Sequence, residues 1–229
     1  MPDQHSLKSD ATDNSSSPSI QRTLISSDSA VRCSRCHLRI WSIMLVGLFT
    51  DLFTKAWVVV RLGLPFQQLD PDVPAIEQIA PLYQWAVQRF GDSSDLFPRV
   101  YSIVPDMFRF VTVFNPGASW GFFAGKTGWL LTGSFVALLF MMWLITTLEK
   151  RQWVAQIAVG MLFAGALGNT HDRIFNRGSV VDFIDVNLHF PPANPWPSFN
   201  IADSLLCVGV ATLLICMFRV NRKRDKTTE

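Results

Sequence analysis

The sequence has few charged residues, and the positive and negative ones nearly balance. Asp, Glu, Lys and Arg make up 17% of the 229 residues, whereas an average soluble domain has about 25%. The formal net charge is only +2, which argues against a strongly basic surface for nucleic acid. Hydrophobic residues make up 49% of the chain. This composition is typical of a membrane protein.

Cysteine and histidine are also scarce, with four of each. Cys33 and Cys36 lie in "RCSRCHLRI", which has the C-x-x-C-H spacing of a c-type haem attachment site or of half a zinc site. A second C-x-x-C is missing, and the polar residues before the motif do not have the pattern of a signal peptide. We therefore interpret both cysteines as free thiols. We place His171 and His189 at the surface or the membrane interface, and we expect neither metal nor cofactor.

Four apolar segments are long enough to cross a bilayer, which takes about 20 residues. Their approximate ranges are 40–60, 128–148, 154–171 and 200–220. The third is short and rich in Gly and Ala, as helix contacts in lipid often are. Residues 1–37 are polar and serine-rich and predict a disordered tail, and residues 221–229 form a basic tail. The sequence thus predicts an α-helical polytopic membrane protein whose membrane domain spans residues 38–220.

Lys and Arg beside the spans predict their orientation. Three arginines precede the first span, Lys150 and Arg151 separate the second from the third, and "RVNRKRDK" follows the fourth. Both termini are therefore expected in the cytoplasm, and the two remaining connections on the outer side. Further arginines occur in these long outer connections, where the rule has less force.

Residues at about 62–110 form most of the first outer connection. Within it, "IAPLYQWAVQRF" has apolar residues at helical spacing, and "FRFVTVFN" alternates like a strand. "NPGASWGFFAG" follows, where Pro and Gly predict a turn after which a second aromatic stretch returns. We expect an extra outer helical segment and a small extracytoplasmic β-element resting on the four transmembrane helices.

Acidic residues gather where the last two spans approach each other. Asp172 ends the third span, Asp203 begins the fourth, and Asp182 lies in the connection between them, so a helical hairpin would bring all three to the outer side. In the first span, Asp51 and Lys55 are four residues apart and share a helix face. Ionisable residues at the centre of a span cost at least ~2.5–3.5 kcal/mol and usually mark a working site.

Two carboxylates about 3 Å apart cannot both ionise, so one keeps a proton that the other lacks. Such a pair supports aspartic peptidase chemistry, in which one member activates water and the other donates its proton. Spacing alone does not choose between Asp172 and Asp182 as the partner of Asp203. No grouping of Ser, His and Lys beside the acids favours a serine mechanism.

Three other readings explain parts of the pattern. In the first, the charged residues form only simple ion pairs, Asp51 with Lys55 and Asp172 with Arg173. A proton-coupled transporter would use Asp51, Asp172 and Asp203 as a relay, but it predicts acids spread through the membrane depth and repeat symmetry between halves. The third, a structural assembly protein, accounts for the ion pairs alone.

Five short motifs occur in one order along the chain: "DLFTK" at 51–55, "NPGASWG" at 115–121, "GNTHDR" at 168–173, "VVDF" at 180–183 and "FNIADS" at 199–204. With the four spans, they make residues from about 40 to 220 resemble the lipoprotein signal peptidases, also called signal peptidase II. The resemblance implies an aspartic endopeptidase at the outer face of the bacterial inner membrane. It would remove signal peptides from prolipoproteins before a cysteine that carries diacylglycerol. The expected partners are these substrates and membrane lipid, without nucleic acid or cofactor, and the chain is expected to act as a monomer.

Matching motif by motif, the resemblance implies that Asp182 and Asp203 are the catalytic pair. Residues implied to line or brace the site are Asp51, Asn115, Asn169, Asp172, Arg173, Asn200 and Ala202. To these we add Lys55, which shares a helix face with Asp51, and Gly117 and Ala118, whose small size would let a peptide backbone approach closely. We expect Arg173 to meet lipid phosphate or to hold Asp172, and Asp185 to be a solvated loop residue. The chain departs from the family in having Leu52 where Gln is usual. Its N-terminal tail is also longer than the family's, as is the segment at about 62–110, which we call the insertion.

Overall fold

The computed structural model describes Ala30 and residues 33–64, 72–91, 99–118, 122–189 and 196–225. Four of its helices are long and apolar enough to cross a membrane, which confirms the predicted number of spans. They are α1 (Ser34–Leu62), α3 (Thr127–Thr147), α4 (Trp153–Phe175) and α5 (Ile201–Asp225).

The first helix begins earlier than the sequence suggested. Residues 34–37 were assigned to the disordered tail, but they belong to α1, since this stretch contains no Gly or Pro that would end a helix. Nearly all of the remaining tail lies outside the described residues. The basic tail is helical up to Asp225, where α5 ends.

The first and third spans run in the same direction and touch through small residues. A Cβ added to Gly160 would lie 2.7 Å from the carbonyl oxygen of Ile40, and one added to Gly47 would lie 2.8 Å from Cβ of Ala164. Residues later in α1 thus contact residues later in α4, so the two helices are parallel. Glycine allows this close approach, which van der Waals packing between helices in lipid requires.

The fourth span runs antiparallel to the third. A Cβ on Gly165 would lie 2.5 Å from the carbonyl oxygen of Ala202, at the start of α5, and one on Gly209 would lie 2.8 Å from Cδ2 of Leu162. Residues later in α5 therefore contact residues earlier in α4. Helix α3 joins α4 through a short turn, so the four helices alternate in direction.

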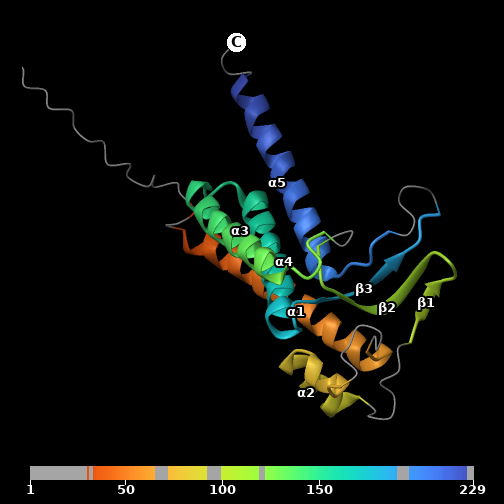
Figure 1. Ribbon diagram of the computed structural model, residues 1–229. Coiled ribbons are helices and arrows are strands. Elements are labelled where there is room, and N and C mark those ends of the chain that lie inside the picture. The colour runs from red at the N-terminus through yellow and green to blue at the C-terminus, as the bar shows by residue number, and fades with distance from the viewer. Residues whose placement is uncertain are drawn as a thin grey trace, which may run out of the picture.

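A three-stranded antiparallel sheet lies at one end of the bundle (Figure 1). Its strands are β1 (Tyr101–Val104), β2 (Phe108–Asn115) and β3 (Val180–Val186), in that order. Strand β2 coincides with the predicted "FRFVTVFN", whereas β1 and β3 were not predicted. Residues 122–125 form turns, and residues 119–121 of "NPGASWG" lie outside the described part of the chain. We call this end of the bundle the sheet end.

The insertion also forms the predicted extra helix, α2 (Pro81–Phe90), preceded by a 3-10 turn, η3 (Ala75–Gln78). Proline at the first helical position suits a helix start. The backbone N–H of Ala80 donates to Oδ1 of Asn176 at the end of α4. Buried residues of α2, α1 and the sheet form one apolar cluster, which includes Tyr83, Val59 and Val181. The insertion is thereby packed onto the sheet end of the bundle (Figure 1).

Candidate active site

The start of α5 is fixed by two polar side chains that bond to each other's backbone. Oδ1 of Asn200 accepts a hydrogen bond from the N–H of Asp203 at 3.0 Å, and Oδ2 of Asp203 accepts one from the N–H of Asn200 at 3.2 Å. This reciprocal arrangement is a capping box, with Asp in the place of the usual Glu or Gln. The motif "FNIADS" therefore both begins the helix and orients the Asp203 carboxylate.

Asn200 also reaches the second acid of the predicted pair. Its Nδ2 donates to Oδ1 of Asp182 at 2.7 Å, and it lies 3.2 Å from Oδ1 of Asn169 and 3.3 Å from the carbonyl oxygen of Val181. Asn200 is fully buried. One asparagine thus contacts both Asp182 and Asp203 and holds β3 against α5.

The two carboxyl groups have different surroundings. Asp182 is buried on β3, and its Oδ2 accepts a hydrogen bond from Nδ2 of Asn115 at 2.9 Å. Burial, and then the charge of Asp203, raises the pKa of Asp182 to about 7. Asp203 is half-buried in the first turn of α5, where the helix dipole favours a negative charge, and its Oδ1 accepts from Nδ2 of Asn169 at 2.8 Å.

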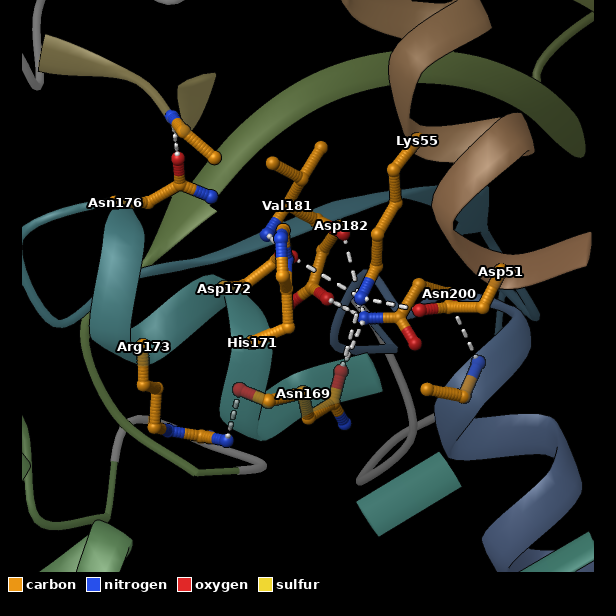
Figure 2. A network of polar contacts seen from close by, with 12 residues as sticks. Asp51, Lys55, Asn169, His171, Asp172, Arg173, Asn176, Val181, Asp182 and Asn200 are labelled. Carbon is orange, nitrogen blue, oxygen red and sulfur yellow. Dashed lines mark hydrogen bonds and ion pairs between the residues drawn. The ribbon is translucent and has the colours of Figure 1, made fainter. Parts of the chain in front are cut away.

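A buried lysine, Lys55, points toward Asn169 and Asn200 (Figure 2). Nζ of Lys55 is 2.8 Å from Oδ2 of Asp51, 3.1 Å from Oδ2 of Asp172 and 3.1 Å from Oδ1 of Asn169. The side chains of Lys55, Asp51 and Asp172 are completely buried. The predicted pair of Asp51 and Lys55 is therefore present, but it is part of a larger network that joins α1 to α4.

The two buried acids also accept hydrogen bonds from other elements. Oδ1 of Asp51 accepts from the N–H of Ala202 in α5 at 2.8 Å, and Oδ2 of Asp172 accepts from the N–H of Val181 in β3 at 3.0 Å. The phenol of Tyr83 in α2 donates to Oδ1 of Asp172 at 2.6 Å. The network thus brings α1, α2, α4, α5 and β3 to one place.

Arg173 makes contacts other than those expected. Its Nη2 donates to the carbonyl oxygen of Gly117 at 3.0 Å, and its Nη1 to that of Asn169 at 3.3 Å. It therefore holds the turn after β2 against α4, whereas Lys55 and Tyr83 hold Asp172. The same turn is closed by Oδ1 of Asn115, which accepts from the N–H of Gly117 at 3.0 Å, and the N–H of Ala118 donates to Phe122 across it.

The expectation for Asp185 is wrong. This residue lies in β3, its side chain is 13% exposed, and it pairs with Arg109 directly opposite on β2. The antiparallel register removes it from solvent by giving it a cross-strand partner of opposite charge. His171 is half-buried beside Asp172 and the ring of Tyr83, and His189 is exposed. Within the described residues, no group of three or more His, Cys, Asp or Glu side chains is arranged to hold a metal.

Comparison with known proteins identifies the family. The sequence model of the family described as signal peptidase (SPase) II matches residues 43–219. The chain belongs to the signal peptidase II family. It is 34% identical over 126 residues to the lipoprotein signal peptidase of Desulfitobacterium hafniense, covering 55% of this chain and 78% of that protein. For the lipoprotein signal peptidase of Staphylococcus aureus, the identity is 32% over 155 residues, covering 67% and 88%.

The fold agrees with this identification. A solved structure of a bacterial membrane enzyme matches with a TM-score of 0.54 and 25% identity, covering 82% of this chain and 90% of that one. A second such structure matches with the same TM-score and identity, covering 81% and 94%. The chain is thus a multi-pass membrane peptidase of the family that removes signal peptides from prolipoproteins.

Two features of this signal peptidase II chain were not predicted. Tyr83 and Asn176 connect the insertion to α4, across separations of 89 and 96 residues, and no local pattern marks either of them. The surroundings of Leu52 were not predicted either. It lines an apolar groove of about 550 Å³ between α1 and α2, together with Trp57 and Trp85.

Proposed function

We propose that this signal peptidase II is an aspartic endopeptidase whose catalytic pair is Asp182 and Asp203. The observation that carries the proposal is the contact of Asn200 with both carboxyl groups. Hydrogen bonds from Asn115 and Asn169 hold the remaining oxygens of the pair. Asp172 is engaged by Lys55, Val181 and Tyr83, which leaves it less suited than Asp182 to exchange protons.

The two acids take different roles in the proposed reaction. Asp182, whose pKa is about 7, carries the proton, and Asp203 is the member that accepts one. Asp203 takes a proton from water while the water oxygen attacks the peptide carbonyl carbon, and Asp182 gives its proton to the carbonyl oxygen. When the carbon–nitrogen bond breaks, Asp203 passes its proton to the leaving amine and Asp182 recovers one from the hydroxyl of the intermediate.

The location of the pair suits a lipid-linked substrate. A prolipoprotein whose cysteine carries diacylglycerol stays anchored in the bilayer, so the bond before that cysteine lies near the membrane surface. The sheet end, where α4 ends and α5 begins, is at this depth. We place it at the outer face of the bacterial inner membrane, with both termini in the cytoplasm and the protein acting as a monomer without a cofactor. Gly117 and Ala118 offer little side-chain bulk to an approaching peptide backbone.

The test is cleavage of a diacylglyceryl-modified prolipoprotein by the purified protein in detergent, followed by gel shift. Asp182→Asn and Asp203→Asn should each lower the rate by about 10²–10⁴-fold. Asp185→Asn, on the same strand but paired with exposed Arg109, is the matched control and should cleave like wild type. Mass spectrometry of the product should find the modified cysteine at its new N-terminus.

Each outcome bears on the proposal. Asp182→Asn should remain folded, because Asn has the shape of Asp and adds no charge to the interior, and its melting temperature in detergent checks this. Loss of cleavage in a stable variant would therefore identify a chemical role. Wild-type rates in either Asp→Asn variant would show that the pair is wrongly assigned, and an inactive, well-folded wild type would oppose the proposed substrate.

A further inference from the structure

Tyr83 carries a polar group from the insertion into the interior of the protein. It lies in α2 and is completely buried, and its phenol donates to Oδ1 of Asp172 at 2.6 Å. This distance is typical of a hydrogen bond from a hydroxyl to an ionised carboxylate, which is about twice as strong as a bond between neutral groups. The ring packs in the cluster with Val59 and Val181, so the hydroxyl is held where it is.

The hydroxyl makes the shorter of two contacts to Oδ1 of Asp172, from which Nδ1 of His171 is 3.3 Å away, and so helps to orient this carboxylate. With Oδ1 engaged by Tyr83, Oδ2 faces the N–H of Val181 at 3.0 Å and Nζ of Lys55 at 3.1 Å. Val181 immediately precedes Asp182 in β3. A rotation of the Asp172 carboxylate would therefore weaken the bond that holds this part of β3 against α4.

The phenol remains a donor throughout the working pH range. Burial, and then the nearby charge of Asp172, raises the pKa of Tyr83 well above its usual value. It therefore does not act as an acid or base in the reaction. The helix that carries it is anchored independently, because the N–H of Ala80 donates to Asn176.

We propose that Tyr83 is a positioning residue of the active site, which acts through Asp172 and the Val181 amide to hold Asp182 in its reactive place. This inference rests on the proposed function, since it takes Asp182 as catalytic. The insertion is then part of the machinery of the site. Without the Tyr83 bond, the same acids are present but the carboxyl of Asp182 is less well aligned with the peptide bond.

The experiment is steady-state kinetics of Tyr83→Phe on the diacylglyceryl-modified prolipoprotein, with rates normalised to folded protein. The variant keeps the ring and loses only the hydroxyl. We expect kcat to fall about tenfold with KM unchanged, because Asp182 is less well aligned. This fall corresponds to a rise of about 1.4 kcal/mol in the activation free energy. Tyr101→Phe is the matched control: Tyr101 is 61% exposed on β1, so its kcat and KM should equal those of wild type.

Hydrogen exchange adds a readout that a general loss of stability would not give. In Tyr83→Phe, exchange should quicken in peptides that contain the Val181 amide, while α3 exchanges as in wild type. Unchanged kcat, a raised KM with unchanged kcat, or faster exchange throughout the protein would each overturn the inference. These results leave the proposed function standing, because wild type would still cleave and Asp182→Asn would not.

Discussion

Replacing Lys55 by methionine would remove the ammonium group that Asp51 and Asp172 share. Both carboxylates are completely buried, at 2.8 and 3.1 Å from Nζ. Methionine has a similar length but no charge, so two negative charges would remain in an interior without their partner. Breaking a buried ion pair in this way costs about 3–5 kcal/mol, because the remaining charge is left uncompensated.

The loss should be visible as a lower melting temperature in detergent. For chains of about this length, 1 kcal/mol corresponds to about 2–4 °C, so Lys55→Met should melt about 6–20 °C below wild type. The matched control is Lys150→Met, because Lys150 is exposed in the turn between α3 and α4. This control should melt within about 2 °C of wild type.

A second variant tests the electrostatic reason for the loss. In Lys55→Met combined with Asp51→Asn and Asp172→Asn, no buried charge is left unpaired, and the asparagine oxygens still accept from Ala202 and Val181. This triple variant should recover at least half of the lost melting temperature. If Lys55→Met melts like Lys150→Met, or if the triple variant melts lower than the single one, the buried ion network does not stabilise the protein as argued.

Two further predictions concern the acids and the helix packing. Because Asp182 must be protonated to donate and its pKa is raised to about 7, kcat/KM should fall as the pH rises through about 7; a profile that stays flat to about pH 9 would contradict this role. In Gly168→Ala, the added methyl group would overlap Oδ2 of Asp51, so the free energy of unfolding should fall by about 1–3 kcal/mol in denaturant titrations. Gly133→Ala, in α3 where nothing lies within 4 Å of an added Cβ, is its control and should not lose stability.

Patterns that repeat along the chain were enough to predict most of the elements. The four spans follow from apolar length, β2 from alternation in "FRFVTVFN", and α2 from apolar spacing after Pro81. Strand β3 has no such pattern: Val180–Val186 is mostly apolar on both faces and interrupted by acids. It is a strand because it pairs with β2, whose residues lie far away in the sequence.

The site could be predicted where its contacts lie within motifs, and not where they join distant segments. The spacing of Asp51 and Lys55 predicted their ion pair, but the bond from Lys55 to Asp172 depends on how α1 and α4 pack. Asp185 was expected to be solvated because only the register of β2 and β3 places Arg109 opposite it. The hydrogen bond from Tyr83 to Asp172 could not be predicted, since it depends on how the insertion packs against α4.

The position of Asn200 and Asp203 in the chain has a consequence for biosynthesis. They begin α5, which follows every other described helix and strand, so the ribosome makes Asp182 before the groups that complete its surroundings. A nascent chain that stops after β3 has one acid of the proposed pair and none of the bonds from Asn200. Proteolytic activity should therefore arise only when α5 has entered the membrane. Incomplete chains should not cleave nearby proteins.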